Sequence, residues 1–449
     1  MSRNPHHPAR RRLRTALASA VALGMTAALA ACSSGGGASS SSSTAHVTLQ
    51  YWGWNPGTKA VVSAFNASHP DVTIKYESLS TKVDEMNDLT NSVKAGDAPC
   101  LVQGQSEDLL SLVSEGIPAD ITQWIAPDKS DFSTSAYSYT TVQGKNYAVP
   151  TATSPGFLIY RADVFKKYGL TAPTTYSQFI ADGKVLASHG VYITNFAGED
   201  PSTLENMAMQ AGAHWYSIDG NAWKVDFTDP GSLEAADVIQ QIVDDNLDSQ
   251  ISFADYAAVQ RNYDAGGTVT RWISTWQMAG MVKNYTKSDG DWAIAPWTRY
   301  DGQGLALPAG LNNASGNNFV TSQCKYIPQA AEAALWMSTN ATAVSIMASP
   351  STGSDFYPAL ADTTPYVSEI VPQKLLGSNT AAATPVITDS ISHIVTGWTF
   401  GPDWTAMGAE EANGWAKVLT KQETVVQLLD HMQQWVVADL KSRGISVVS

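Results

Sequence analysis

Strand-like and helix-like segments alternate from residue 47 to residue 116, and this order constrains the fold more than any other feature of the chain. Short apolar or alternating runs typical of strands cover residues 47–52, 72–76 and 101–103. Apolar residues at helical spacing follow each run, over residues 58–67, 83–93 and 109–113. A β-α-β-α-β-α order predicts a parallel sheet with helices on its faces, and therefore an α/β fold.

A second α/β unit follows the first. Its expected strands are residues 157–160, 191–194 and 292–295. Its expected helices are residues 161–168, a helix that begins at Pro173-Thr174-Thr175, and residues 233–243. Further helices are predicted over residues 330–337, 415–419 and 425–440, whereas residues 361–403, rich in Pro and Gly, are predicted to be a long loop. Two α/β units in one chain predict two lobes.

The N-terminus has the pattern of an export signal. The basic run Arg10–Arg14 precedes an apolar stretch over residues 15–31, which is shorter than a membrane-spanning helix needs. The stretch ends at Leu29-Ala30-Ala31-Cys32, which resembles a bacterial lipobox, and Ser and Gly dominate residues 33–43. We predict a signal peptide over residues 1–31, a lipidated Cys32 with a tether over residues 32–45, and an anchor on the outer face of the cytoplasmic membrane. The basic run fits a twin-arginine signal and a plain basic region equally well.

The charge balance disfavours nucleic acid as a partner. The first 31 residues carry five of the 27 basic residues and no acid, so the exported chain keeps 22 basic against 41 acidic residues, a net charge of −19. A surface of that sign repels phosphate backbones. The length of 449 residues allows two or three domains.

Motifs for cofactor, metal or nucleophilic chemistry are missing from the sequence. There is no dinucleotide-binding, P-loop, zinc-protease or nucleophile-elbow motif, and the histidines show no ligand spacing. The acidic pairs Glu107-Asp108, Asp244-Asp245 and Glu410-Glu411 lie on expected helices, where adjacent side chains point apart. We therefore expect no catalytic residue, no metal and no cofactor. The spacing of Cys100 and Cys324 leaves a disulfide and two separate thiols equally open.

Aromatic residues are the chemistry that the chain does carry. It has 14 Trp and 17 Tyr, and several tryptophans fall where strands end or loops begin. Trp54 lies in the turn Gly53-Trp54-Asn55-Pro56, and Trp276 lies in Ser274-Thr275-Trp276-Gln277. Indole faces stack on the C–H faces of sugar rings, while neighbouring polar groups bind hydroxyls. As a set the tryptophans predict a carbohydrate site, although core packing stays an equal alternative for any one of them.

The order of several short motifs resembles the extracellular solute-binding proteins of ABC sugar importers, the family that includes maltose-binding protein. The motifs are residues 47–54 (VTLQYWGW), 64–72 (AFNASHPDV), 94–99 (KAGDAP), 147–150 (YAVP) with 158–161 (LIYR), and 169–176 (GLTAPTTY). The chain departs from the family pattern at Cys100, where Asp is usual, at Tyr176, where Trp is usual, and in the stretch 312–316 (NNASG).

This resemblance implies a two-lobed, type II periplasmic-binding-protein-like fold with three hinge crossings, near residues 152–154, 312–316 and 358–361. Lobe one would comprise residues 46–151 and 317–358, and lobe two residues 155–311 and 361–449. It also implies a monomer that captures a neutral sugar, a di- or oligosaccharide, between the lobes and delivers it to the importer's membrane permease subunits.

The resemblance also implies individual contacts. The implied ligand-binding residues are Trp54, Asn55, Gln103, Glu107, Trp215, Trp276, Trp398 and Trp404. Cys100 would begin the third strand of lobe one, and Cys324 would end the strand that returns to it, which implies a disulfide between them. Two rivals stay open, namely an exported glycoside hydrolase, which would need two carboxylates facing one bond, and a binder of peptides or polyamines in the same fold.

Overall fold

The computed structural model describes residues 46–79, 82–308, 316–353 and 355–448. The predicted signal peptide, Cys32 and the tether lie outside the described residues, as does all of the expected crossing at 312–316 except Gly316.

A five-stranded sheet organises the first lobe. Its strand order is β2 (Val72–Ser78), β1 (Val47–Gly53), β3 (Leu101–Gln105), β13 (Gly316–Val320) and β6 (Ala148–Pro150). The first three strands are parallel, as the β-α-β order predicts, and β13 runs antiparallel to both β3 and β6. The strand β13 comes from a segment more than 200 residues further along the chain than its neighbour β3, since Val320 pairs with Leu101.

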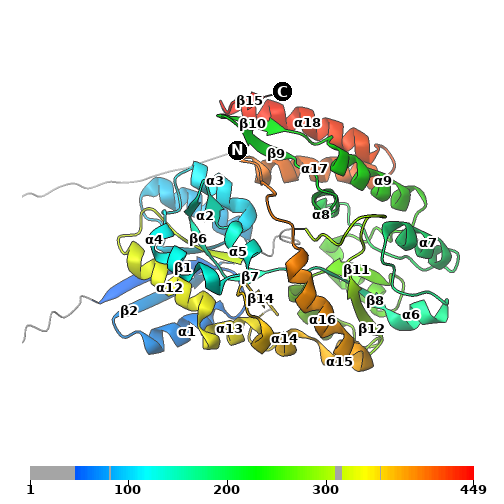
Figure 1. Cartoon of the computed structure of the whole chain (residues 1–449), viewed down its shortest axis with the longest axis horizontal. Helices are drawn as coiled ribbons and strands as arrows, with labels where there is room; N and C mark the ends of the chain where they lie inside the picture. The colour runs from blue at the N-terminus through cyan, green and yellow to red at the C-terminus, as the bar shows by residue number, and fades with distance from the viewer. Residues whose placement is uncertain (1–45, 80–81, 309–315, 354, 449) are drawn as a thin grey trace, which may run out of the picture. The chain divides into compact units, whose positions relative to one another are not determined.

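Helices cover both faces of this sheet. The helices α1 (Thr58–Ser68), α12 (Ile327–Thr339) and α13 (Ala341–Ala348) lie on one side, and α2 (Lys82–Ala95) and α3 (Leu109–Ser114) lie on the other (Figure 1). Consecutive residues of β3 point to opposite faces. Leu101 packs in the core cluster of α1 and α12, whereas Val102 packs with Leu89 and Leu112 of α2 and α3. The strand β3 is thus buried on both of its faces, as is typical of strands in a parallel sheet that helices cover on either side.

A three-stranded antiparallel sheet organises the second lobe. The strand β8 (Phe157–Arg161) lies between β11 (Thr270–Ile273) and β12 (Trp292–Pro296). Leu158 faces a core cluster with α7 (Tyr176–Ala187), α9 (Pro230–Asp244), α17 (Trp404–Leu419) and α18 (Val425–Ser442). Phe157 and Ile159 face a second cluster, with α10 (Tyr256–Asp264) and α11 (Met278–Asn284). The predicted strand 191–194 forms only isolated bridges, through Tyr192 and Thr194.

Smaller elements surround these sheets. Among the helices they include α4 (Thr122–Ile125), α5 (Thr134–Ser138), α6 (Ala162–Lys167) and α8 (Ser202–Gln210). Among the paired strands they include β4 (Thr141–Val142) with β5 (Lys145–Asn146), and β9 (Tyr216–Asp219) with β10 (Ala222–Val225) and β15 (Val447–Val448).

The prediction of a long loop over residues 361–403 is wrong. This stretch contains the helices α14 (Thr364–Ile370), α15 (Gln373–Leu376) and α16 (Thr380–Ser390). Its prolines do not exclude helices, because Pro365 lies in the first turn of α14, where no intrahelical N–H bond is lost. Pro385 lies inside α16 and is held there by tertiary packing, since Ala383 and Ile387 on either side of it are buried in the core.

The described parts of the three expected hinge segments lie side by side. The strand β7 (Ala152–Thr153) pairs antiparallel with β14 (Tyr357–Pro358). The backbone N–H of Thr151 donates to the carbonyl oxygen of Gly316 at 2.8 Å. These contacts bring together the points at which the chain leaves and re-enters the five-stranded sheet.

Candidate functional site

A cleft of about 730 Å³ collects side chains that lie far apart in the sequence. Trp54, Asn55, Gln103 and Gln105 reach it from the ends of β1 and β3 in the first lobe. Trp276 and Lys283 reach it from the second lobe. The volume is within the range of small-molecule pockets, and the lining combines indole rings with side-chain amides.

The loop that presents Trp54 and Asn55 is held by Gln103. The Gln103 Oε1 accepts the backbone N–H groups of Trp54 and Asn55, each at 3.1 Å. This approach needs a glycine at position 53, since a Cβ there would lie 2.8 Å from Oε1. Gln103 is only 3% exposed, so its main role is to shape the loop on which the other two residues lie.

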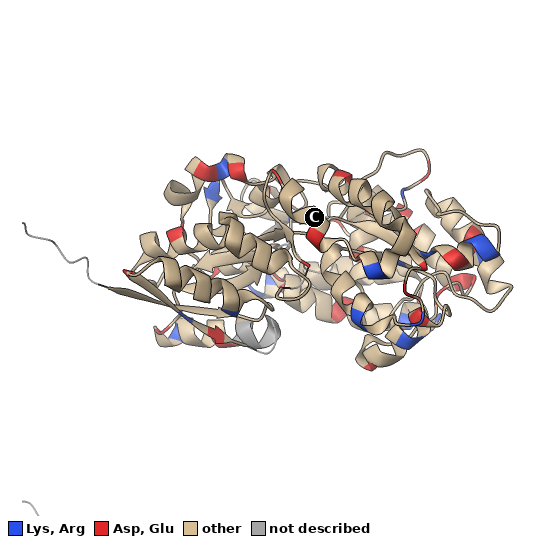
Figure 2. Cartoon of the chain, turned by 90° about the horizontal axis from the view of Figure 1, so that it is seen from below, with Lys and Arg blue, Asp and Glu red and all other residues tan. Residues whose placement is uncertain are grey.

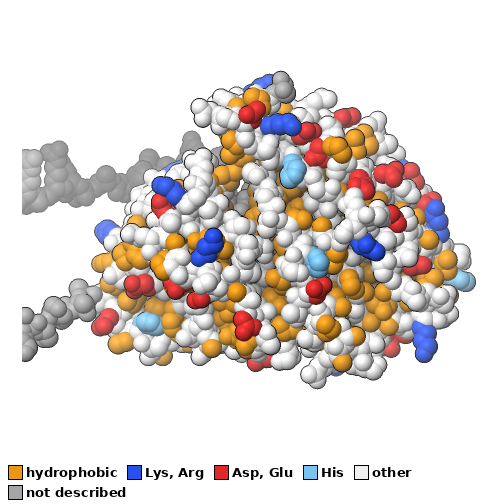
Figure 3. Space-filling view, in the orientation of Figure 1, with side chains coloured by type: hydrophobic (Ala, Val, Ile, Leu, Met, Phe, Trp, Pro, Cys, Tyr) orange, Lys and Arg blue, Asp and Glu red, His pale blue; other side chains and the backbone are white. Residues whose placement is uncertain are grey.

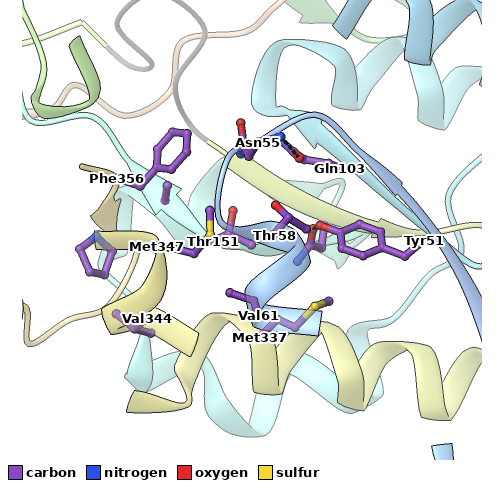
Figure 4. Close-up of a pocket in the computed structure, with 13 residues that line it drawn as sticks. Tyr51, Asn55, Thr58, Val61, Gln103, Thr151, Met337, Val344, Met347 and Phe356 are labelled. Atoms are coloured by element: carbon purple, nitrogen blue, oxygen red, sulfur yellow. Dashed lines mark hydrogen bonds between the residues drawn. The ribbon is translucent and has the colours of Figure 1, made fainter. Parts of the chain in front are cut away.

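A small cavity of about 40 Å³ lies next to the cleft, and Asn55 and Gln103 line both. Figure 4 shows the dashed hydrogen bond between these two residues, beside Thr58 and Tyr51. The Tyr51 hydroxyl donates to Asn318 Oδ1 at 2.7 Å on the same side. Polar and apolar side chains both line the cavity, which is large enough for a water molecule, so the floor beneath Asn55 is not closely packed.

Trp276 stands on a short turn that the chain fixes locally. It belongs to the 3₁₀ turn η4 (Thr275–Gln277), between β11 and α11. The side chain of Gln277 closes the turn, because its Oε1 accepts the Ser274 backbone N–H at 3.1 Å. The ring is half-buried, and its Nε1–H is buried without a hydrogen-bond partner among the described residues. The wall of the cleft at this point is therefore formed by the exposed part of the indole ring and not by its N–H.

Behind Trp276 the cleft continues into a side chamber of about 380 Å³. Trp276 and Gly280 line both spaces. The chamber is otherwise lined by Asp200, Ser202, Phe253, Tyr256, Arg271 and Gln277. Arg271 was not among the predicted contacts, and the only signal for it in the sequence is a charged residue within the otherwise uncharged strand Thr270–Ile273.

Other predicted contacts lie away from this cleft. Trp215 is fully buried in the core, stacks on Phe227 at 4.5 Å between ring centroids, and donates its Nε1–H to Ser232 Oγ at 2.8 Å. The ring and the N–H of Trp215 are thus both engaged within the core. This corrects the expectation that Trp215 contacts the ligand. Trp404 is buried in the same cluster and lines none of the cavities described here. The resemblance located these loops but not the direction of their side chains.

Trp398 and Glu107 also differ from expectation. Trp398 is buried beside Trp215 and Trp404, and lines a separate cavity of about 310 Å³ with Tyr139 and Phe400. Glu107 is buried in the short turn after β3 and lines neither the cleft nor the chamber. Neither residue adjoins Trp54 or Trp276 in the cleft lining.

Cys100 and Cys324, which the resemblance pairs, are joined by a disulfide in the structure. The bond closes a separation of 224 residues, with the two Cα atoms 4.6 Å apart. It lies where β3 begins and just beyond the end of β13, because these strands are antiparallel and Leu101 faces Val320. The other end of the same strand pair carries Gln103 and Gln105 into the cleft.

The described residues lack two further features. They contain no group of three or more His, Cys, Asp or Glu residues that could hold a metal ion. No helix in this part of the chain is long and apolar enough to cross a membrane.

Solved structures show the fold of the chain. It superposes on the galacto-N-biose/lacto-N-biose I-binding protein of an ABC transporter from Bifidobacterium longum, solved with lacto-N-biose, with a TM-score of 0.76 at 23% identity, covering 89% of this chain and 98% of that one. It superposes on the ABC transporter-associated binding protein of B. animalis subsp. lactis, solved with β-1,6-galactobiose, with a TM-score of 0.73 at 17% identity, covering 90% and 99%. The sugar-binding protein MalE of Xanthomonas citri gives 0.72 at 14% identity, covering 88% and 98%. The two-lobed fold that the resemblance implies is therefore confirmed.

Sequence comparisons place the chain in a family. A binding protein of Brucella abortus is 26% identical over 275 residues, which covers 59% of this chain and 63% of that protein, so the match spans less than two thirds of this relative. An uncharacterized lipoprotein of Streptomyces antibioticus is 30% identical over 184 residues, or 38% of this chain and 40% of that protein. Residues 60–362 match the profile of a family whose members are exported binding proteins. The chain thus belongs to the bacterial extracellular solute-binding protein family.

Proposed function

We propose that this protein is the substrate-binding component of an ABC importer, and that it captures a di- or oligosaccharide in the cleft and delivers it to membrane permease subunits. The observation that carries the proposal is that Trp54 and Trp276, from different lobes, line one cleft of about 730 Å³. Two aromatic faces with amide side chains around them are suited to a sugar. Solute-binding proteins of the same fold were solved with lacto-N-biose and β-1,6-galactobiose, which supports this ligand class.

The lining of the cleft argues against the two rival functions. Among the described residues that line it there is no carboxylate, and Lys283 is the one charged side chain. A glycoside hydrolase needs a pair of carboxylates across the scissile bond, and a cationic peptide or polyamine needs acidic partners. The chemistry present there is hydrogen bonding and stacking, which is what reversible binding of a hydroxylated ligand uses.

The surface charge agrees with a small, uncharged or weakly charged ligand rather than a polyanion. On the face shown in Figure 3, basic and acidic side chains are interspersed and no basic patch forms. The view from below shows the same scatter of Lys and Arg among Asp and Glu on several helices (Figure 2). A nucleic-acid-binding face would instead show a basic stripe.

A thermal-shift screen of the purified exported chain over mono-, di- and trisaccharides tests this proposal. A ligand present at 100 times its Kd stabilises a folded protein by about 2.7 kcal/mol, which is readily seen as a rise in Tm. We expect a rise for at least one di- or trisaccharide and no release of chromophore from chromogenic glycosides. Hydrolysis of those glycosides, or shifts only with peptides or polyamines, would contradict the proposal.

We also propose that the mature protein starts at Cys32 and is held on the outer face of the membrane by a lipid. The sequence Leu29-Ala30-Ala31-Cys32 and the Ser- and Gly-rich tether support this, as does the similarity to a lipoprotein of Streptomyces antibioticus. Cys32→Ser is expected to release the protein into the medium or to leave an uncleaved precursor. If the processed variant stays in the membrane fraction as the parent does, the anchor is not at Cys32.

A further inference from the structure

Arg271 is a buried cation whose hydrogen-bonding capacity is mostly unused. Arg271 lies on the strand β11 and is 8% exposed. Its guanidinium lies 5.1 Å from the ring centroid of Tyr263, and its one hydrogen bond is a long one, 3.5 Å from Nη1 to the Tyr285 hydroxyl. A guanidinium carries five N–H donors, so most of them have no partner among the described residues.

This cation forms no ion pair with any of the described residues. Among the described residues, no carboxylate oxygen lies within 4.0 Å of its nitrogens, in contrast to Arg161, whose Nη2 is 2.7 Å from Asp163 Oδ2. The phenols of Tyr263 and Tyr285 beside it remain neutral at physiological pH, since burial raises the pKa of Tyr263 and raises that of Tyr285 to about 12. An unpaired buried charge is costly and rarely retained without a use.

The unused donors are next to space that opens to the cleft. Arg271 lines the side chamber of about 380 Å³ and a recess of about 60 Å³ beside it. The chamber shares Trp276 and Gly280 with the main cleft. A sugar stacked on Trp276 would therefore have its next ring, or a group on its own ring, beside the guanidinium.

From this arrangement we propose that the side chamber binds a carboxylate group, and that the preferred ligand is an oligosaccharide with a uronic acid residue placed at Arg271. The inference rests on the proposed function and makes its ligand class more specific. A guanidinium matches a carboxylate in a planar, two-bond geometry that hydroxyls cannot reproduce. Burial strengthens such a pair, because the dielectric constant of the chamber is lower than that of water.

Asp200 is the one acidic residue among those that line the chamber, and it makes the inference testable in both directions. Its Oδ1 accepts the Ser202 backbone N–H at 3.1 Å, so the carboxylate is fixed at the chamber wall. If the chamber holds hydroxyls of a neutral sugar, Asp200 is an acceptor for them and its loss weakens binding. If it holds a carboxylate, Asp200 repels the ligand and its loss strengthens binding.

The experiment compares four neutral disaccharides (lactose, cellobiose, maltose and β-1,6-galactobiose) with the same four after oxidation of a C6 hydroxyl to a carboxylate. Titration calorimetry is carried out on the unaltered exported chain, on Arg271→Gln and on Asp200→Asn. We expect at least one oxidised sugar to bind at least tenfold more tightly than its neutral form. We expect this preference to disappear in Arg271→Gln and to increase in Asp200→Asn. Arg271→Lys, which keeps the charge, should retain part of it.

The outcomes separate the two proposals. Neutral sugars that bind as tightly as their oxidised forms, with weaker binding in Asp200→Asn, would overturn the carboxylate site and leave the sugar-binding function standing. Absence of binding by all eight sugars, together with no rise in Tm for any sugar of the thermal-shift screen, would overturn both. If Arg271→Gln is too unstable to titrate, Asp200→Asn alone decides, because it is expected to weaken binding of the preferred sugar if that sugar is neutral and to strengthen it if that sugar carries a carboxylate.

Discussion

Trp276 and Trp215 are both in the second lobe, yet their surroundings give them different roles. Trp276 lines the cleft with its Nε1–H unpaired, so Trp276→Ala removes a stacking surface and not a core side chain. We expect this substitution to weaken sugar binding by about 2 kcal/mol or more, the scale of an aromatic anchor at a binding site. That corresponds to roughly thirtyfold in Kd. Calorimetric titration with the sugar found in the screen measures it, and the Tm should change little.

Trp215→Ala is the matched control, because it removes the same side chain from the core of the same lobe. Here the expected loss is in stability, about 3–5 kcal/mol, since a large buried aromatic leaves a cavity. Sugar affinity of the folded fraction should stay close to that of the parent. If instead Trp276→Ala lowers the Tm strongly while Kd is unchanged, Trp276 is a packing residue and the cleft has lost its main contact.

Asp355 is a second residue whose surroundings predict a measurable effect, in this case on pH dependence. It is 1% exposed just before β14, and burial raises the pKa of its carboxyl from the ordinary value of 3.8 to about 7. The folded state thus holds a proton that the unfolded chain has released above pH 4, so stability falls as pH rises from about 4 to 7. Asp355→Asn should reduce this fall and raise the Tm at pH 8. Asn also tolerates the φ of 53° at this position.

The control for this prediction is an exposed aspartate on α18, Asp430→Asn, which should leave the Tm at pH 8 and its change from pH 5 to pH 8 as in the parent. Thermal melts at several pH values measure both variants. A Tm of Asp355→Asn that follows the parent at every pH would mean that the carboxyl is charged and compensated in the folded state.

Among the elements, those with strong local signals could be predicted and those that depend on distant packing could not. The threonine at position 175 predicts the start of α7, and the structure shows its side chain accepting the Gln178 N–H. The helices within 364–390 were missed because Pro365 and Pro385 break the local pattern, whereas burial of Tyr366, Leu375 and Ile387 against the second lobe stabilises them. Burial of this kind depends on the tertiary fold. It produces little local periodicity in the sequence from which a helix could be predicted.

The position of the disulfide at one end of the antiparallel strands β3 and β13 predicts that it stabilises the fold without shaping the cleft. The Cys100–Cys324 bond closes a separation of 224 residues, for which the chain-entropy model gives a stabilisation of roughly 5 kcal/mol, and less in practice. We expect Cys100→Ala/Cys324→Ala to lower the denaturant midpoint substantially. Sugar affinity should be retained, because the bond lies at the end of the strands opposite Gln103 and Gln105. A loss of affinity without a loss of stability would mean that the bond sets the cleft geometry.

For the whole molecule, the sequence could predict which loops meet but not which of their side chains line the cleft. The ends of β1 and β3 were expected in the cleft, and Trp54, Asn55 and Trp276 line it. Arg271 could not be foreseen, because its exposure to the chamber depends on Asp200, Phe253 and Tyr256 approaching from other segments. In the same way, Trp215, Trp398 and Trp404 lie in the right region of the chain, and mutual packing turns their rings into the core.

A contact between the lobes predicts how ligand affinity depends on their arrangement. The Tyr139 hydroxyl, just after α5 of the first lobe, donates to the Val395 carbonyl oxygen at 2.9 Å, and the Val395 N–H in turn donates to Leu307 in the second lobe. Two residues earlier, the Tyr137 hydroxyl makes a bond of similar chemistry within the first lobe, to Asn146 Oδ1 at 2.6 Å. Tyr139 and Tyr137 therefore form a matched pair for mutation. The bond of Tyr139 joins the two lobes, whereas the bond of Tyr137 lies within the first lobe.

A ligand that contacts both lobes stabilises the arrangement in which they are close, and any bond made only in that arrangement adds to its affinity. Tyr139→Phe tests whether the bond from Tyr139 to Val395 is of this kind, in which case its net value of about 0.5–1.5 kcal/mol corresponds to a roughly two- to tenfold increase in Kd. The dissociation rate of the sugar from this variant should then rise, because the closed complex lacks the bond. Tyr137→Phe should lower the Tm and leave Kd unchanged, since both states of the cleft keep the first lobe intact. Stopped-flow and calorimetric titration of both variants measure this, and equal effects of the two substitutions on Kd would show that the Tyr139 bond does not report on closure.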